Sequence, residues 1–217
     1  MALALFDLDN TLLHGDSDYA WGQFLVERGI VDGDAYEKAN RKFYDLYKEG
    51  RLDIYEFIRF AFLPLKENDH EQLLEWRQQF VEEKIAPMML AKGQQTIDKH
   101  RSKGDTLIII TATNSFVTTP IAEAFGVEHL IATEPEFVDG RFTGDVAGVP
   151  CFQEGKVKRL QTWLDDHRMT LEGSTFYSDS HNDLPLLEQV SFPVAIDADD
   201  KLVATATSRN WPITSFR

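Results

Sequence analysis

The chain has 217 residues, a formal net charge of −14 and a single cysteine, Cys151. The negative charge argues against nucleic acid or an anionic membrane as a partner, because both need a basic surface. One cysteine excludes an internal disulfide and suggests the reducing cytoplasm, and the sequence shows neither an apolar run of about 18 residues that could span a membrane nor a signal peptide.

Residues 3–13 read LALFDLDNTLL. The apolar start predicts a strand buried on both faces, as in a parallel sheet. Asp7 and Asp9 follow with a spacing of two, so their side chains should point the same way. Buried acids repel each other unless a cation offsets them, and carboxylates are usual ligands of Mg²⁺. Because α/β sheets bind ligands beyond the carboxyl ends of their strands, this opening predicts a metal-dependent enzyme.

Residues 16–88 have a helical pattern. A simple crossover between parallel strands needs only one helix, so we interpret this segment as an inserted helical cap rather than the first part of the core. We predict four helices from their spacing, caps and breakers: 17–28 ended by Gly29, 34–49 ended by Gly50, one capped at Asp53 and ended by Pro64, and 69–85 followed by Pro87.

Strand and helix alternate after residue 88. This pattern predicts an α/β, Rossmann-like core of residues 1–15 and 89–217, with a parallel sheet and helices on both faces. The expected elements are helix 90–103, strand 106–111, a short helix begun by Thr119 and Pro120, strand 129–132, a hairpin over 136–146 turning at Asp139 and Gly140, helix 154–168, strand 175–178, helix 182–189 and strand 192–196.

Polar residues with possible functions follow three of these predicted elements. Thr111 ends a strand, where its hydroxyl and the next backbone N–H, that of Ala112, could bind a phosphate oxygen, although a threonine there is usually structural. Lys156 begins a helix and, taken alone, is more simply explained as a surface residue. Asp179 and Asp183 follow another strand, and helix capping explains one of these acids but hardly both.

Taken in order, these residues resemble the haloacid dehalogenase-like superfamily of aspartyl phosphatases. The matching features are the DxDxT stretch at 7–11, Thr111, Lys156, and the acids Asp179 and Asp183. The helical insertion is similar to the type-one cap of the phosphoserine phosphatase-like branch. Ser178 stands where a glycine often precedes the final acids, and we interpret that position as a spacer.

The resemblance implies a role for each matching residue. Asp7 would attack phosphorus and carry the phosphoryl group, and Asp9 would act first as an acid and then as a base. Mg²⁺ would be the cofactor, held by Asp7, the backbone carbonyl of Asp9 and Asp179, with Asp183 in support. The expected phosphate contacts are Thr111, Ala112, Lys156 and Asn182.

The resemblance also bears on the substrate, a small phosphorylated metabolite. Asp16 matches an acid that faces the substrate amine in phosphoserine phosphatases, although an ordinary helix N-cap explains it equally well. Arg51 and Arg59 could bind a carboxylate, but surface roles are the simpler explanation. Chains of this size and opening are often assigned to L-histidinol phosphate, which we rank first, with phosphoserine second. Aromatic residues that could stack on a planar group, or simply pack, are Trp21, Phe24, Phe43, Tyr44, Tyr47, Tyr55 and Phe57.

Other kinds of protein share parts of this pattern. A phosphorylated signalling receiver would show a long-lived acyl phosphate, but receivers have about half this length and no large helical insertion. An inactive interaction protein on the same fold would not need to keep every polar group of the reaction. A phosphomutase would return a phosphorylated product.

Overall fold

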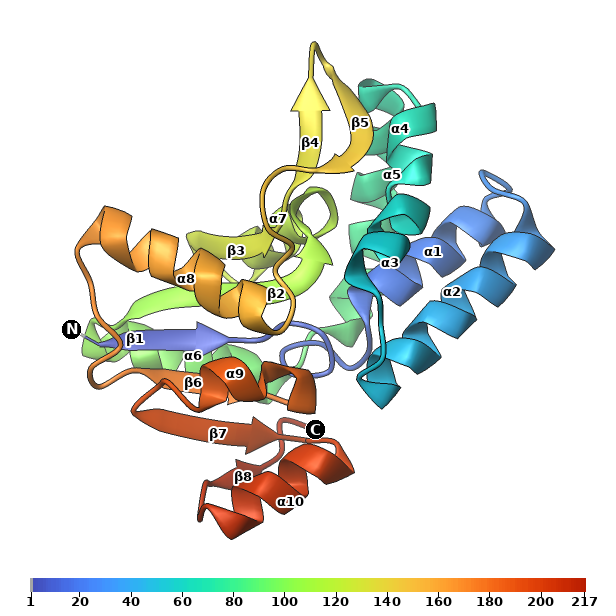
Figure 1. The fold of residues 1–217 in the computed structure, drawn as a ribbon. Helices are drawn as coiled ribbons and strands as arrows, with labels where there is room; N and C mark the ends of the chain where they lie inside the picture. The colour runs from blue at the N-terminus through green and yellow to red at the C-terminus, as the bar shows by residue number, and fades with distance from the viewer. Residues whose placement is uncertain (1) are drawn as a thin grey trace.

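The computed structural model describes residues 2–217 and has a six-stranded parallel sheet at its centre (Figure 1). The strand order is β3-β2-β1-β6-β7-β8, with β1 inside the sheet and bordered on both sides. The predicted α/β fold is therefore confirmed. The strands are β1 (Leu3–Phe6), β2 (Thr106–Asn114), β3 (His129–Thr133), β6 (Thr175–Ser178), β7 (Phe192–Ile196) and β8 (Ile213–Thr214).

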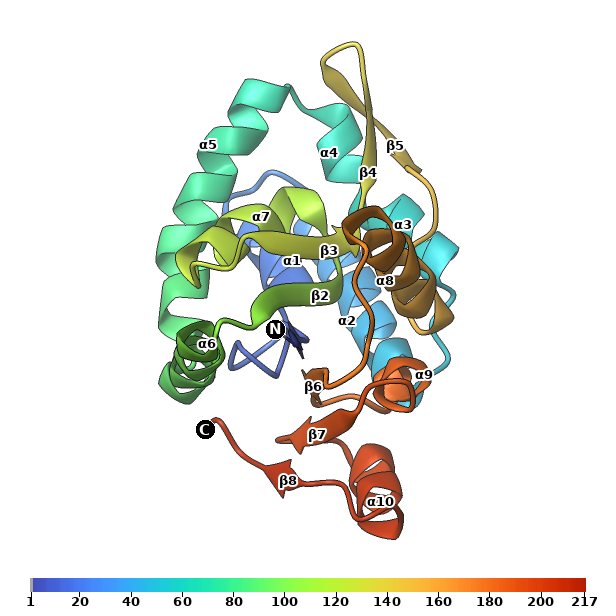
Figure 2. The same ribbon diagram turned by 90° about the vertical axis from the view of Figure 1, so that its left-hand side faces the viewer.

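Helices cover both faces of the sheet (Figure 2). Ala4 and Phe6 point into an apolar cluster with helices of one face, and Leu3 and Leu5 point into a second cluster with helices of the other. This alternation explains why β1 reads as an unbroken apolar run. The first face carries α6 (Ala91–Lys103) and α7 (Ser115–Ala124), and the second α8 (Glu154–His167), α9 (Leu184–Leu187) and α10 (Asp200–Ser208).

The helical segment between β1 and α6 has α1, α2 and α3 beyond the carboxyl ends of the central strands (Figure 1). The chain enters and leaves this segment at one place, because Leu13 forms an antiparallel bridge with Met89 and the His14 N–H donates to the Met88 carbonyl at 2.7 Å. An inserted cap needs such adjacent connections. Its helices are α1 (Ser17–Glu27), α2 (Gly33–Glu49), α3 (Ile54–Ala61), α4 (Leu63–Glu67) and α5 (His70–Phe80), followed by a π-helical turn (Val81–Ile85) and a 3-10 turn (Ala86–Met88).

Two prolines lie at other helix positions than the sequence predicts. Pro64 begins the short α4 besides following α3. Pro120 lies inside α7, which Asn114 caps, so our prediction that Pro120 begins this helix is wrong. Since proline has no N–H to give the carbonyl of Phe116, one turn earlier, Arg77 donates to that carbonyl instead at 3.0 Å.

The sheet also extends further than its apolar residues indicate. β2 continues past Thr111 to Asn114, because Asn114 pairs with Thr133 after an irregularity in the ladder. The predicted hairpin forms β4 (Pro135–Val138) and β5 (Arg141–Val146), which packs against α3 and α4. Neither α10 nor β8 was predicted.

No helix within residues 2–217 combines the length and apolar character needed to cross a membrane.

Candidate active site

Asp7 follows β1 directly, and its N–H donates to the carbonyl of Tyr177 at 2.9 Å, which continues the parallel ladder by one residue. Its side chain is buried, and the Nζ atom of Lys156 in α8 donates to its Oδ1 atom at 2.7 Å. The same Nζ lies 2.7 Å from Oδ1 of Asp183. Burial alone would lower the pKa of Lys156, but Asp183 and Asp7 together raise it. Lys156 is therefore a buried ammonium group between two acids, not a surface residue.

Asp9 is held in one orientation by donors on both of its carboxylate oxygens. After Asp9 the chain turns through a left-handed conformation at Asn10 (φ 58°), which asparagine tolerates better than most residues. The Ser17 N–H then donates to Oδ1 of Asp9 at 2.6 Å, and the Thr113 hydroxyl donates to Oδ2 at 2.8 Å. Sequence reasoning missed Thr113, although it lies two residues after Thr111 and so extends from the same side of β2.

The final pair of acids is bound by hydroxyl groups. Thr11 donates to Oδ1 of Asp179 at 3.1 Å. The hydroxyl of Ser178 donates to Oδ2 of Asp183 at 2.7 Å, so our interpretation of Ser178 as a spacer is wrong. Because its hydroxyl holds Asp183 beside Lys156, Ser178 forms part of the polar network.

The acids of this network fit a divalent cation. The carboxylates of Asp7 and Asp179 are near enough that, besides burial, the charge of Asp7 raises the pKa of Asp179. Burial raises the pKa of Asp7 to about 7 against the opposing effect of Lys156, and burial together with Asp7 and Asp183 raises the pKa of Asp179 well above its usual value. A metal ion here would replace the proton and keep both groups ionised. Within residues 2–217 no three His, Cys, Asp or Glu side chains gather as metal ligands; Mg²⁺ suits such a site, because it commonly takes one or two carboxylates and completes its shell with water.

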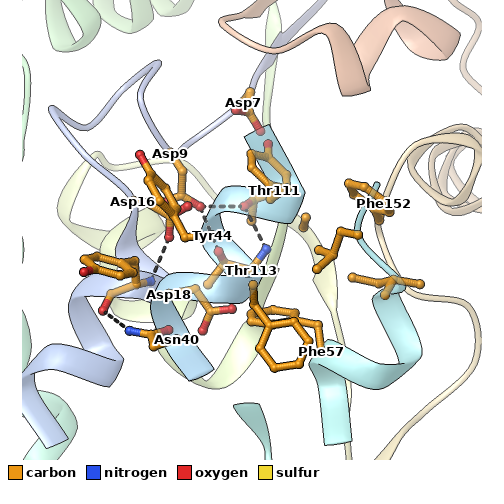
Figure 3. Close-up of a pocket in the computed structure, with 16 residues that line it drawn as sticks. Asp7, Asp9, Asp16, Asp18, Asn40, Tyr44, Phe57, Thr111, Thr113 and Phe152 are labelled. Atoms are coloured by element: carbon orange, nitrogen blue, oxygen red, sulfur yellow. Dashed lines mark hydrogen bonds between the residues drawn. The ribbon is translucent and has the colours of Figure 1, made fainter. Parts of the chain in front are cut away.

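A cavity opens beside Asp7 and Asp9 (Figure 3). Thr111 and Ala112 line it, whereas Lys156, Asp179 and Asn182 do not. One wall comes from the core and the other from the helical segment. The lining residues are Asp7, Asp9, Asp16, Asp18, Tyr19, Asn40, Phe43, Tyr44, Tyr47, Leu52, Ile54, Phe57, Thr111, Ala112, Thr113 and Phe152.

Asn182 makes two hydrogen bonds that the sequence did not predict. Its Nδ2 atom donates to the carbonyl of Tyr47 at the end of α2, at 3.1 Å, and its Oδ1 atom accepts from Gln153 at 3.0 Å. The amide therefore connects the helical segment to the core. Its contact with phosphate stays a prediction.

The position of Asp16 is compatible with both explanations, a helix N-cap and an acid that faces the substrate. It is the N-cap of α1, accepting from the Tyr19 N–H at 2.8 Å, and it lines the cavity. Asp18 also lines the cavity, and no pattern in the sequence singled it out. Arg51 and Arg59 are exposed and are not among the lining residues.

The aromatic candidates divide into three groups. Trp21 and Phe24 are fully buried and pack into the apolar core, and Tyr55 is exposed. The remaining four candidates line the cavity: Phe43, Tyr44, Tyr47 and Phe57.

Comparisons with known proteins agree with this geometry. Residues 4–188 match the model of the haloacid dehalogenase-like hydrolase family. The chain is 43% identical over 219 residues to a histidinol-phosphatase of Neisseria meningitidis serogroup C, covering 99% of each protein. It is 32% identical to phosphoserine phosphatase SerB1 of Mycobacterium tuberculosis, covering all of this chain and 71% of that protein.

A solved structure shows the same fold in detail. A crystal structure of a Bordetella pertussis Tohama I protein of unknown function superposes with a TM-score of 0.94 at 41% identity, over 100% of this chain and 99% of that one. The chain belongs to the haloacid dehalogenase-like hydrolase family, and its relatives place it among the phosphatases of that family.

Proposed function

We propose that the protein is a Mg²⁺-dependent phosphatase that hydrolyses L-histidinol phosphate through an aspartyl-phosphate on Asp7. The observation that carries this proposal is the position of Asp7. It lies beside the buried ammonium group of Lys156 and at a cavity whose charged lining residues are all acidic.

In the first half of the reaction, a carboxylate oxygen of Asp7 forms a bond to phosphorus as the bond from phosphorus to the ester oxygen breaks. Asp9, protonated and held by Ser17 and Thr113, gives its proton to the leaving oxygen. The alcohol leaves and Asp7 carries the phosphoryl group.

In the second half, the Asp9 carboxylate takes a proton from water, and the water oxygen attacks phosphorus. The bond to Asp7 breaks and inorganic phosphate forms. Thr111, the Ala112 N–H and Lys156 are suited to hold the charged phosphoryl oxygens. Bound by Asp7, the Asp9 carbonyl and Asp179, with Asp183 in support, Mg²⁺ would supply further positive charge at the phosphoryl group.

The cavity favours histidinol phosphate over phosphoserine. Both substrates carry an amine, but phosphoserine also carries a carboxylate. None of the described lining residues is a lysine or arginine that could pair with this carboxylate, while Asp16 and Asp18 would repel it. The imidazole of histidinol phosphate suits the aromatic wall, and the Neisseria relative bears this function in its name.

We also propose that residues 16–88 act as a cap over a core of residues 1–15 and 89–217, which the paired connections at Leu13 and Met89 support. A cytoplasmic location is consistent with the single buried cysteine, Cys151.

The test is phosphate release across a panel of phosphorylated metabolites, with Asp7→Asn as the inactive control. We expect kcat/KM for histidinol phosphate to exceed that for phosphoserine by at least about tenfold, because charge repulsion disfavours the latter. Equal values, or a preference for phosphoserine, would contradict the substrate assignment. Phosphate release by Asp7→Asn at the wild-type rate would contradict the mechanism.

A further inference from the structure

The cavity has two chemically different ends (Figure 3). Asp7 and Thr111 lie toward one end, where the proposed function places the phosphate. Asp18, Asn40 and Phe57 lie toward the other. A phosphomonoester bound at Asp7 therefore extends its organic part toward Asp18.

We propose that Asp18, and not Asp16, binds the positively charged nitrogen group of the substrate. This inference rests on the proposed function, because it assumes that phosphate binds beside Asp7. It differs from the family resemblance, which points to Asp16.

The two acids differ in their partners. Asp16 is committed to the fold, because its carboxylate caps α1 by accepting from the Tyr19 N–H at 2.8 Å. The Asp18 carboxylate has no hydrogen-bond or ion-pair partner anywhere in residues 2–217. A partly buried acid without a partner is unfavourable, and a cationic ligand would satisfy it.

The surroundings of Asp18 favour an organic cation over an anion. Every charged residue that lines the cavity is acidic, so a second anionic group, away from the phosphate site, would be repelled. Tyr19, Phe43 and Phe57 also line the cavity. Aromatic faces attract cations and stack on planar rings, so a protonated amine or an imidazolium group suits this end.

The wall beside Asp18 is closely packed. Asn40 is almost fully buried, and its Nδ2 atom donates to the Tyr19 carbonyl at 3.1 Å. A side-chain carbon on Gly22 would approach this Nδ2 atom to 2.5 Å, so the glycine allows α1 and α2 to pack closely here. Packing and a hydrogen bond of this kind give the support that a specificity residue needs.

The experiment compares two phosphate esters of equal size as competitive inhibitors of p-nitrophenyl phosphate hydrolysis. 2-Aminoethyl phosphate carries an ammonium group where propyl phosphate carries a methyl group. We expect wild-type enzyme to bind the aminoethyl ester at least about tenfold more tightly, as a charged hydrogen bond implies. Asp18→Asn and Asp18→Ser should each remove this preference. Asp16→Asn should keep it with little change in Tm, because an asparagine side chain caps α1 as well as an aspartate does.

Asp34→Asn, an exposed acid on α2, is the matched control and should behave as wild type. A wild-type enzyme without the ammonium preference, or an Asp18→Asn enzyme that keeps it, would overturn the inference. Since inhibition is measured without turnover of histidinol phosphate, failure here is distinct from failure of the substrate assignment in the metabolite panel.

Discussion

The Nζ atom of Lys156 lies 2.7 Å from the Oδ1 atom of Asp7, and both side chains are buried. The same ammonium group bonds to Asp183, so one positive charge is shared between two acids that come from different ends of the chain. The pair fixes the orientation of Asp7 at the end of β1 and leaves it facing the cavity.

Removal of this ammonium group should affect both stability and activity. Lys156→Met leaves two buried acids without a counter-charge, so we expect the free energy of unfolding to fall by about 3–5 kcal/mol, and phosphatase activity to be lost. Urea denaturation and phosphate release measure the two effects. Lys158→Met, an exposed change two residues along α8, is the control. If both variants unfold at the same urea concentration, the ammonium group of Lys156 does not stabilise the folded protein.

Thr113→Val should disturb Asp9 alone, because the Thr113 hydroxyl donates to Oδ2 of Asp9 at 2.8 Å. A misoriented acid matters most when the leaving oxygen needs a proton. We expect kcat/KM to fall about tenfold or more for an alkyl phosphate, and much less for p-nitrophenyl phosphate, whose leaving group departs as an anion. Thr113→Ser keeps the hydroxyl and should keep the wild-type ratio. An equal loss on both esters would show that Thr113 acts only on the fold.

Magnesium binding can be measured without catalysis. We expect Mg²⁺ to raise the Tm of the wild-type protein, since a ligand that binds only the folded state stabilises it. Asp179→Asn should lose this shift, and the exposed Asp165→Asn should retain it. Chelation should also abolish phosphate release by the wild type. A full Mg²⁺ shift in Asp179→Asn would remove Asp179 from the metal site.

Asp18 should make stability depend on pH. Burial, with a contribution from the charge of Asp9, raises the pKa of Asp18 to about 7, from 3.8 in the absence of these effects. The folded protein therefore holds this proton more tightly than the unfolded chain does. This tighter proton binding stabilises the folded protein. The stabilisation is fully present below pH 3.8 and is lost as pH rises to about 7.

Asp18→Asn cannot ionise, so in Mg²⁺-free buffer its free energy of unfolding should decline less than that of wild type as pH rises from about 4 to 7. Denaturation at several pH values measures the difference, and Asp34→Asn again serves as the control. Parallel curves for wild type and Asp18→Asn would mean that Asp18 ionises normally in the folded protein.

The core strands could be predicted because their signal is local. β1 is a short apolar run buried on both faces, and β6 and β7 are short strands that are partly buried. The polar residues that follow β1 and β6 mark the functional edge of the sheet. α10 carried a local signal that we overlooked. Asp199 caps this helix by accepting from the Leu202 N–H at 2.8 Å.

Other features depend on contacts between distant segments. The bond from Thr113 to Asp9 spans 104 positions, and the link from Asn182 to Tyr47 spans 135. Arg77, from another helix, satisfies the carbonyl of Phe116 that Pro120 leaves without a partner inside α7. Local patterns contain no information about such partners, which explains why the sequence placed Pro120 wrongly and did not reveal Thr113.

The most direct test of the central claim is to locate the phosphoryl group on the enzyme. Enzyme is mixed with p-nitrophenyl phosphate, quenched in acid during turnover and treated with borohydride, which reduces an aspartyl-phosphate to homoserine. Peptide mass spectrometry then identifies the modified residue. We predict homoserine at position 7 in the wild type and none in Asp7→Asn. Homoserine at another aspartate, or an active enzyme with position 7 unchanged throughout turnover, would contradict the account.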